Sequence, residues 1–178
     1  MNENEKVIWC DTRQKPKQWN WLKECFIRMG YKIKDDKPMT YGDYCIPPNL
    51  STLVDTKFAI QELIGNCTQG HQRFARELDG AYEMGATLYI LIQDEKVKCI
   101  DDLEHWENPR IKNWAIQKNR ALKKGLPYQK QPPTSGKQLA KILRTMEISH
   151  HTKFMFCRKE EMAKKIIELL TTDRKEFE

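Results

Sequence analysis

The sequence predicts a mixed α/β protein, in which helices cover the faces of a central β-sheet. Short apolar runs typical of buried strands alternate along the chain with longer segments of helical periodicity. The chain has 178 residues, 39% of them hydrophobic and 31% charged, so it is long enough to bury a core and has a globular composition. We therefore expect a single domain over 1–178.

The first half of the chain predicts a strand, a helix and a β-hairpin. The run VIWC at 7–10 is apolar and ends at Asp11, as a buried strand would. Apolar side chains then recur at helical spacing over 17–29. The stretch over 41–57 is typical of two strands, joined around Pro47-Pro48-Asn49.

The second half continues the alternation of helices and strands. A helix starts at Gln61 and continues over 71–84, and ATLYILIQ at 86–93 is the strongest central strand. The pattern weakens over 94–133, where a helix is expected only near 111–124. The chain closes with a helix capped by Ser135 or Thr134, a strand and a second helix. These closing elements span about 134–146, 152–157 and 160–170, within a unit of about 134–171.

A strongly basic segment precedes and enters the closing unit. From Arg110 to Arg144 there are ten basic residues and no acidic one, so the remainder of a chain of net charge +6 carries −4. The ten are Arg110, Lys112, Lys118, Arg120, Lys123, Lys124, Lys130, Lys137, Lys141 and Arg144. Such a segment either binds a polyanion such as nucleic acid or forms a solvated surface. Trp114 and Tyr128 within it are candidates to stack on unpaired bases.

The cysteines and the termini predict the compartment. The six cysteines show neither a CxxC motif nor close pairing, so we expect reduced, mostly buried side chains and no structural zinc site. No apolar run approaches the roughly 18 residues that cross a bilayer. The polar start MNENEK is unlike a secretory signal. We expect a cytoplasmic protein in a prokaryotic or phage-like context, or a nuclear one in a eukaryote.

Two carboxylates are expected to meet across the hairpin. If the turn is centred on Asn49, antiparallel pairing places Asp43 opposite Asp55. Like charges directly across a strand pair are destabilising, and burial increases the cost. A divalent cation between them removes the conflict, and magnesium commonly uses one or two carboxylates with waters and substrate phosphates as its other ligands.

Lys57 extends this pair into a candidate hydrolytic site. Because side chains alternate along a strand, Asp55 and Lys57 share a face, roughly 6.6 Å apart along the chain. Thr56 is expected to point away and to leave its carbonyl facing the metal. An ammonium beside the carboxylates can orient water and stabilise charge on a phosphate, and Asp11 could supply a third carboxylate. The set suits phosphodiester hydrolysis, although an Asp-x-Lys triplet alone is usually a surface ion pair.

Several ordered segments resemble one known family. VIWCDTRQK, YGDY, LVDTK, ELIGN and GHQRFAREL are together similar to the nuclease domain of the XPF-type structure-specific endonucleases. That family belongs to the PD-(D/E)xK superfamily, so the resemblance implies a restriction-endonuclease-like nuclease core. The closing helix, strand and helix also resemble that domain. The similarity spans about 6–170, except a basic insertion at about 95–133.

The resemblance implies roles for individual residues. The metal-binding acids of the family fall on Asp43 and Asp55, its catalytic lysine on Lys57, and its first-strand acid on Asp11. Two further positions, Arg13 and Arg73, match arginines near the family's active site. The implied cofactor is Mg²⁺ or Mn²⁺, and the implied substrate is branched or partly single-stranded DNA, such as a flap or fork, in repair or recombination.

The sequence departs from the family pattern at several positions. Asp55 stands where the family has glutamate, Thr56 where it has arginine, and Gln14 where it has glutamate. The family's further aspartate falls on Gln61 by strict spacing, or on Glu62 with one extra residue, which keeps an acid. Glu77 could support the site or only pair with Arg73 four residues earlier on the same helix.

Two functions follow from these observations. The first is a metal-dependent endodeoxyribonuclease in which the basic insertion, through Lys112, Lys118, Arg120, Lys123 and Lys124, replaces the DNA-gripping module common in the family. The second is a non-catalytic DNA-binding or scaffold subunit with a nuclease fold. The apolar final helix either forms a homodimer, as the resembled family does through this region, or only covers the sheet.

Overall fold

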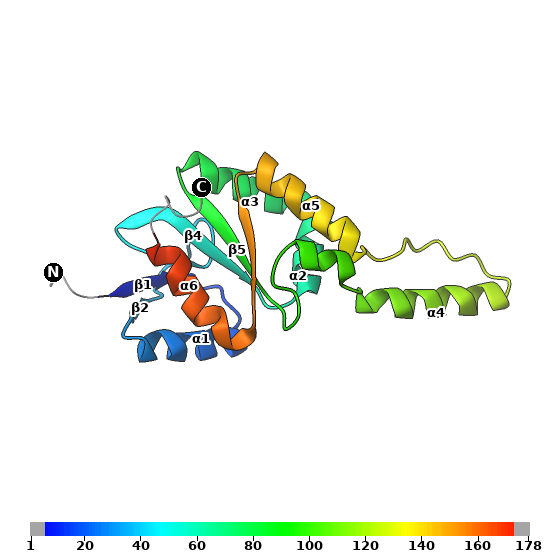
Figure 1. Cartoon of the computed structure of the whole chain (residues 1–178), viewed down its shortest axis with the longest axis horizontal. Coiled ribbons are helices and arrows are strands. Elements are labelled where there is room, and N and C mark those ends of the chain that lie inside the picture. Colours follow the sequence, from blue (N-terminus) through cyan, green and yellow to red (C-terminus); the bar gives the residue numbers. More distant parts are fainter. Residues whose placement is uncertain (1–5, 173–178) are drawn as a thin grey trace.

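The structure, a computed structural model, describes residues 6–172 and has the mixed α/β architecture that the sequence predicts (Figure 1). Six strands form one sheet in the order β2-β1-β3-β4-β5-β6. The strands are β1 (Val7–Cys10), β2 (Lys32–Lys34), β3 (Tyr44–Ile46), β4 (Asn49–Lys57), β5 (Thr87–Gln93) and β6 (Lys153–Cys157). The α-helices are α1 (Pro16–Arg28), α2 (Ile60–Cys67), α3 (His71–Glu83), α4 (Pro109–Lys123), α5 (Gly136–Ser149) and α6 (Met162–Thr171). Two short 3₁₀-helices are η1 (Asp101–His105) and η2 (Lys159–Glu161).

The sheet combines antiparallel and parallel pairing. β3 is antiparallel to both β1 and β4, whereas β4, β5 and β6 run parallel to one another and β1 runs parallel to β2. β5 is buried through its centre because helices cover both faces, as a parallel sheet requires. The carboxyl ends of β4 and β5 therefore lie at one edge of the sheet.

Two apolar layers hold the helices on the sheet. On one face Phe26 of α1 and Ile166 of α6 pack with Val54 of β4 and Leu91 of β5. On the other face the inner sides of α2, α3 and α5 pack against alternate residues of the same strands, with Phe74 fully buried. Alternation along β4 thus sends Val54 to one layer and Leu53 to the other.

Some elements differ from the expectation in informative ways. The three-residue strand β2 was not predicted, because its sequence KIK has only one apolar residue and lies at the sheet edge. The expected continuous helix after Gln61 is two helices, α2 and α3, separated at 68–70. Ser135 does cap α5, in a reciprocal capping box with Gln138.

The hairpin between β3 and β4 turns at a cis peptide bond between Pro47 and Pro48. Ile46 pairs with Asn49 next to the turn, but Tyr44 pairs with Val54, so a register shift lies between the two pairs. The observed turn lies earlier in the chain than the expected turn at Asn49, and the register shift compensates for this difference. It restores the register that was expected from a turn at Asn49, so that Asp43, one residue before Tyr44, is aligned with Asp55.

Helix α6 covers the sheet of its own chain. Its apolar residues are buried in that layer: Met162, Ala163, Ile166, Ile167, Leu169 and Leu170. The exposed residues of α6 include Lys164 and Thr171. Of the two roles considered for this helix, packing on its own sheet is the one that the described residues display.

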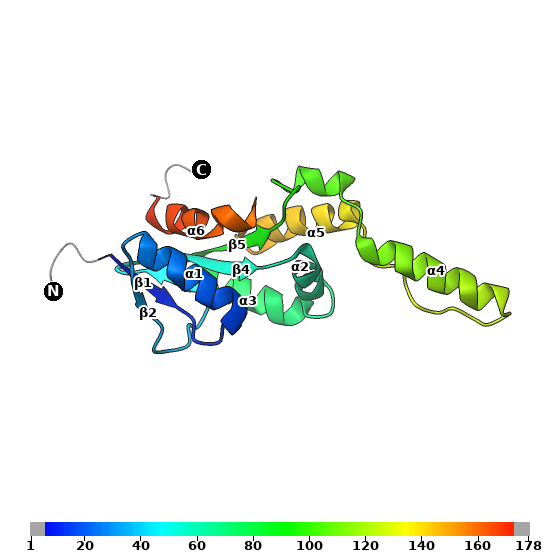
Figure 2. The same ribbon diagram turned by 90° about the horizontal axis from the view of Figure 1, so that it is seen from below.

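The basic segment forms a projecting arm. We define the basic arm as residues 109–134, which comprise α4 and the extended segment that returns to α5 (Figure 1 and Figure 2). Gly125, at φ 64°, reverses the chain after α4. In both views the basic arm extends beyond the rest of the molecule, and none of the residues of α4 is buried.

Among the described helices, none is long and apolar enough to span a membrane. The six cysteines are all unpaired, and four of them, Cys10, Cys45, Cys67 and Cys157, are buried.

Candidate active site

Asp43 is placed by the glycine that precedes it. Gly42 has φ 67°, and a Cβ at this position would lie 3.0 Å from Leu88 Cδ1 and 3.1 Å from the Val54 carbonyl oxygen. Only glycine fits this left-handed, closely packed position. The backbone of Asp43 is then held from both sides, since its N–H donates to Val54 O (2.8 Å) and its carbonyl accepts from Asp11 N–H (2.8 Å).

The carboxylate of Asp43 is held by Thr56. Its Oδ2 accepts hydrogen bonds from Thr56 N–H (2.9 Å) and from the Thr56 hydroxyl (2.6 Å). Thr56 therefore does not point away from the site, as strand alternation predicted. Strand β3 begins only at Tyr44, so Asp43 lies outside the ladder and its side chain takes the place of a backbone acceptor for Thr56.

Asp55 and Lys57 lie on the same face of β4, as the alternation predicted, and form a buried ion pair. Lys57 Nζ contacts Asp55 Oδ2, and the side chains are 10% and 8% exposed. Apart from this ion pair, the buried Asp55 Oδ2 has no hydrogen-bond partner among the described residues. Lys57 Nζ also lies 5.8 Å from the centre of the ring of the buried Phe74, so apolar surface adjoins the ammonium.

The charges of these side chains perturb one another strongly. Burial and the neighbouring Asp55 carboxylate raise the pKa of Asp43 to about 7, although the hydrogen bonds from Thr56 oppose this rise. Burial works against the charge of Lys57, but Asp55 and Asp43 hold the pKa of its ammonium above the ordinary value. Closely placed titratable groups with such shifts are typical of functional sites.

Asp43, Asp55 and Lys57 line one cleft of about 660 Å³ at the carboxyl end of β4. Arg13 and Arg73 also line it, so two of the expected DNA-contacting arginines lie at this cleft. The remaining lining comes mainly from the start of α1 and from α2 and the loop after it: Gln14, Lys15, Thr56, Phe58, Glu62, Gly65, Asn66, Gln69 and Gly70.

Asp11 is not brought into the cleft. Its Oδ1 accepts from Arg13 N–H (2.6 Å) and its Oδ2 accepts from Arg13 Nη2 and from Met39 N–H (2.9 Å). Burial opposes the charge, but these hydrogen bonds hold the pKa of Asp11 below its ordinary value. Asp11 therefore braces Arg13 and the loop at Met39, and its oxygens are already used.

The two supporting acids lie at different depths. Glu62 lines the cleft in the first turn of α2, and its Oε2 accepts from Phe58 N–H (3.2 Å). Glu77 is half-buried on α3 outside the cleft lining. Burial and Asp55 raise the pKa of Glu77, and Lys57 and Arg73 oppose this rise. Glu62 is thus at the cleft rim, and Glu77 acts on the site only through its charge.

Gln14 is a site residue whose role was not foreseen. Its amide nitrogen donates to the Asp43 carbonyl (3.3 Å), and its amide oxygen accepts from the Tyr44 hydroxyl (2.5 Å). The amide thus links the loop before α1 to the segment that carries Asp43. Its position three residues after Asp11 was the one indication in the sequence that Gln14 lies near the site, and only the structure gives its partners.

The residues of the cleft fit a divalent cation. The described part of the chain has no group of three His, Cys, Asp or Glu side chains that could hold a metal. Two carboxylates nevertheless line the cleft, and the one contact of the buried Asp55 Oδ2 among the described residues is its ion pair with Lys57. Magnesium needs no more than one or two carboxylates when waters and substrate phosphates complete its coordination.

The expected base-stacking residues of the basic arm pack against each other instead. The rings of Trp114 and Tyr128 meet edge to face, with centroids 6.1 Å apart. Trp114 Nε1–H donates to Lys130 O (2.8 Å), and Lys118 Nζ lies 4.9 Å from the Trp114 ring centre. These contacts fix the returning segment on α4. Of the other expected DNA-binding residues, Lys112, Arg120, Lys123 and Lys124 are exposed.

Comparison with known proteins gives a likeness in structure only. No family model matches the sequence, and none of the curated proteins does. The fold is similar to that of XPF from Aeropyrum pernix, with a TM-score of 0.57 and 12% identity over 92% of this chain and 63% of that one. It is also similar to XPF from Aeropyrum pernix in complex with DNA, with a TM-score of 0.57 and 14% identity over 96% of this chain and 70% of that one. The XPF-like nuclease fold implied by the sequence resemblance is thereby confirmed, while the chain spans only part of the length of those structures.

Proposed function

We propose that this protein is an endodeoxyribonuclease that depends on Mg²⁺ or Mn²⁺ and cuts branched or partly single-stranded DNA, such as flaps and forks. The observation that carries the proposal is the convergence of Asp43, Asp55 and Lys57 on one cleft. The likeness to an XPF structure that was determined in complex with DNA supports DNA as the polyanion.

In this proposal Asp43 and Asp55 hold the cation. When bound, the cation supplies neutralisation of the phosphate oxygens and polarisation of the attacking water. Thr56 keeps Asp43 in position through its two hydrogen bonds, and Gln14 holds the backbone behind it. Water adds to phosphorus while the bond to the leaving oxygen breaks, which gives one strand end with a phosphate monoester and one with a hydroxyl group.

Lys57 retains its proton and acts on the developing charge. Its raised pKa keeps Nζ cationic at neutral pH, so the ammonium can stabilise the phosphorane-like transition state and orient the water. Arg13 and Arg73 line the same cleft and suit binding of neighbouring backbone phosphates. Arg13 is oriented for this by its bonds to Asp11 and to Met39 O (2.6 Å).

The test is cleavage of end-labelled flap and fork DNA with Mg²⁺, Mn²⁺ or EDTA. Asp43→Asn, Asp55→Asn and Lys57→Met are each expected to reduce the rate by about 100-fold or more, as for loss of groups that act in the transition state. Asp36→Asn and Lys37→Met are matched controls, because both residues are exposed and line a different cavity. Circular dichroism and thermal unfolding check that each variant is folded.

Two outcomes would contradict the proposal. Equal cleavage by wild type and by all cleft variants would place the activity elsewhere. A wild-type protein that binds flap DNA, but cleaves it with neither cation, would instead be a non-catalytic DNA-binding subunit with a nuclease fold.

A further inference from the structure

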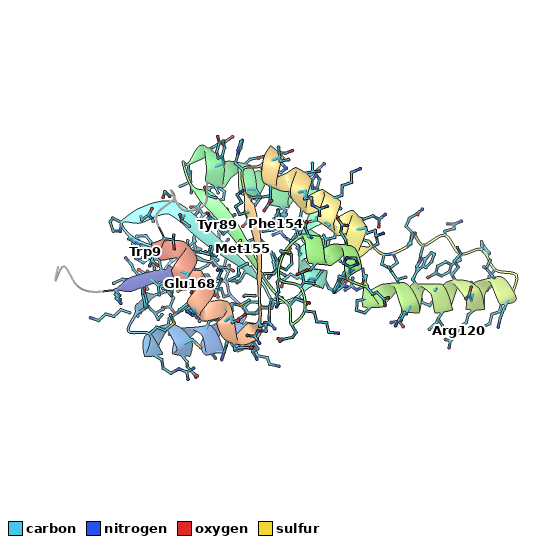
Figure 3. The ribbon with its side chains drawn as sticks, in the orientation of Figure 1. Trp9, Tyr89, Arg120, Phe154, Met155 and Glu168 are labelled. Carbon is cyan, nitrogen blue, oxygen red and sulfur yellow. The ribbon has the colours of Figure 1, made fainter. Side chains whose placement is uncertain are left out.

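The outer face of α4 is a continuous cationic and amide surface. Lys112, Ile116, Arg120 and Lys123 are spaced by four, four and three residues, so they lie along one side of the helix. All four are exposed, and in Figure 3 Arg120 extends from the side of α4 opposite the returning segment. Asn113 and Asn119 are also exposed and flank this row. We call these six residues the outer face.

The opposite side of α4 is occupied. Trp114 and Lys118 of that side contact Tyr128 or each other, and Gln117 accepts from the Tyr128 hydroxyl (3.2 Å). The aromatic rings are therefore engaged in holding the returning segment. The basic arm offers a ligand its polar outer face rather than a platform for stacking on unpaired bases.

Among the residues that the structure describes, the cations of the outer face have no carboxylate partner. Within residues 6–172, no ion pair involves Lys112, Arg120 or Lys123. A helix without buried residues gains little from the core, and three unpaired cations along one side favour a polyanion. An α-helix with its side chains is about 10–12 Å in diameter. It therefore fits the major groove of B-DNA, which is about 12 Å wide.

The chemistry of the outer face suits base edges as well as phosphates. Arginine and asparagine are side chains that form bidentate contacts with guanine and adenine in the major groove, and an apolar side chain can contact the thymine methyl group. Arg120, the two asparagines and the 49% exposed Ile116 provide these groups between the lysines. A lipid surface would instead contact an apolar stripe, and the other exposed large apolar residues of the basic arm, Leu122 and Leu126, lie outside the outer face.

The base of the basic arm is tied to the cleft. Asn108 is 2% exposed, caps α4 by accepting from Arg110 N–H (3.0 Å), and donates to Thr134 O (2.8 Å) at the other end of the basic arm. Its Oδ1 also accepts from Gln61 Nε2 (2.7 Å) of α2. The next residue of α2, Glu62, lines the cleft. The basic arm therefore starts from the helical turn that borders the candidate active site.

We infer that α4 docks its outer face in the major groove of duplex DNA next to the cleavage point, so that the substrate must include a double-stranded part. This inference rests on the proposed function, which it deepens by assigning the duplex to the basic arm and the scissile phosphate to the cleft. Cation contacts to phosphates position the duplex, while Arg120 and the asparagines meet base edges.

The test is binding without cleavage, measured in EDTA by fluorescence anisotropy. The probes are a labelled DNA duplex of about 20 base pairs, roughly two helical turns, the corresponding single strand, and an RNA duplex of the same sequence. The outer-face variant is Lys112→Gln/Arg120→Gln/Lys123→Gln, in which glutamine preserves helix propensity. The matched control is Lys17→Gln/Lys141→Gln/Lys153→Gln, which removes the same charge from exposed positions of the rest of the molecule.

The inference predicts that the outer-face variant binds duplex DNA about tenfold or more weakly. Its salt slope should be shallower by up to about 2, since Lys112 and Lys123 contact phosphates and each lost phosphate contact changes the slope by about 0.9. The control and single-strand binding should change far less. Duplex RNA should bind wild type more weakly than duplex DNA, because its major groove is too narrow for a helix.

Equal losses in the outer-face and control variants, or equal losses for duplex and single strand, would overturn the inference. So would duplex RNA binding as tight as that of duplex DNA. Because these measurements involve no hydrolysis, they test the inference separately from the proposed function. Loss of cleavage in a folded Asp55→Asn protein that binds duplex DNA normally would bear on the proposed function and not on this inference.

Discussion

At the scale of single residues, the hydrogen bonds from Thr56 to Asp43 are central to the cleft. Both the backbone N–H and the hydroxyl of Thr56 donate to one oxygen of Asp43. They lower the pKa of a carboxyl group that burial and Asp55 raise. Thr56 therefore helps to keep Asp43 ionised and oriented, which a metal ligand requires.

Replacing Thr56 tests this positioning role. Thr56→Val keeps the shape and the backbone N–H but removes the hydroxyl, so we expect about 1–2 kcal/mol lower stability and a weaker stabilisation by Mg²⁺. Thermal unfolding with and without Mg²⁺ measures both. Thr52→Val, at another buried threonine of β4, is the matched control. An undiminished Mg²⁺ effect in Thr56→Val would show that the hydroxyl does not position the ligand.

The pKa of Asp43 gives a pH prediction with a definite sign. The carboxyl pKa rises from 3.8 to about 7 on folding, so the metal-free folded state binds the proton more tightly than the unfolded state. The stability contributed by this proton is complete below about pH 3.8 and is lost as the pH rises through about 7. A cation can replace the proton, so the stabilisation by Mg²⁺ should grow over the same range.

Thermal unfolding in EDTA and in Mg²⁺ at several pH values measures this exchange. Asp43→Asn should lose both the pH-dependent component and the growth of the Mg²⁺ effect, because the amide neither titrates in this range nor carries charge. A variant whose Mg²⁺ effect still increased with pH would show that another group is responsible.

The sequence was sufficient for some of these residues and insufficient for others. Asp55 and Lys57 follow from alternation within one strand. The expected alignment of Asp43 with Asp55 holds only because a register shift compensates for a turn that lies at Pro47-Pro48 and not at Asn49. The contacts of Thr56 and Asp11 depend instead on where β3 begins and on how the loop at Met39 folds. Strand periodicity describes residues inside a ladder, so it cannot place side chains beyond its end.

At the scale of elements, Asn108 joins three segments with one side chain. It caps α4, binds Gln61 of α2 and holds Thr134 before α5. Gly136 packs so closely on the carbonyl oxygens of Leu103 and Trp106 that a Cβ would collide with both. The two ends of the basic arm are thus fixed by a buried amide and by a backbone contact that excludes a side chain.

Asn108→Ala is expected to lower the free energy of unfolding by about 2–3 kcal/mol, because it removes a cap and leaves polar groups of the half-buried Gln61 and Thr134 without this partner. It should also increase protease cleavage within 109–134. Asn119→Ala, on the exposed side of the same helix, is the control and should change stability by less than about 0.5 kcal/mol. Equal stability of the two variants would contradict the role of Asn108.

Elements with a strong apolar pattern were predictable from the sequence, and those held by other forces were not. The central strand at 87–93 and the closing helices show clear periodicity, and their core residues are buried as expected. Strand β2 has a single apolar side chain and depends on backbone pairing with β1. The direction of α4, which lacks buried residues, is set by the Asn108 contacts and was not readable from composition.

At the scale of the whole molecule, charge is divided between two parts. The basic arm, 109–134, holds seven basic residues and no acid, so the remainder of a chain of net charge +6 carries −1. In solution the nearly neutral remainder attracts a polyanion only near the cationic side chains of the cleft, whereas the basic arm attracts it strongly. A nucleic acid is thereby favoured to approach through the basic arm and to reach the cleft beyond its base.

Removal of the basic arm separates capture from chemistry. Its two ends lie close together, since Asn108 Nδ2 donates to Thr134 O (2.8 Å), and α4 has no buried residue. Replacing 110–133 with a short Gly/Ser linker should therefore leave the core and the Mg²⁺ stabilisation largely intact.

For a flap substrate with a duplex part, deletion of the basic arm should raise KM about tenfold or more at physiological salt. The value of kcat should remain within about threefold, because the groups that act in the transition state are retained. Low salt should partly restore KM. Steady-state cleavage at two salt concentrations measures these effects. The variant Lys17→Gln/Lys141→Gln/Lys153→Gln is the control for loss of three of the seven charges at positions outside the basic arm. A large fall in kcat with unchanged KM would mean that the basic arm takes part in the chemical step, contrary to a division of labour between capture by α4 and hydrolysis at Asp43, Asp55 and Lys57.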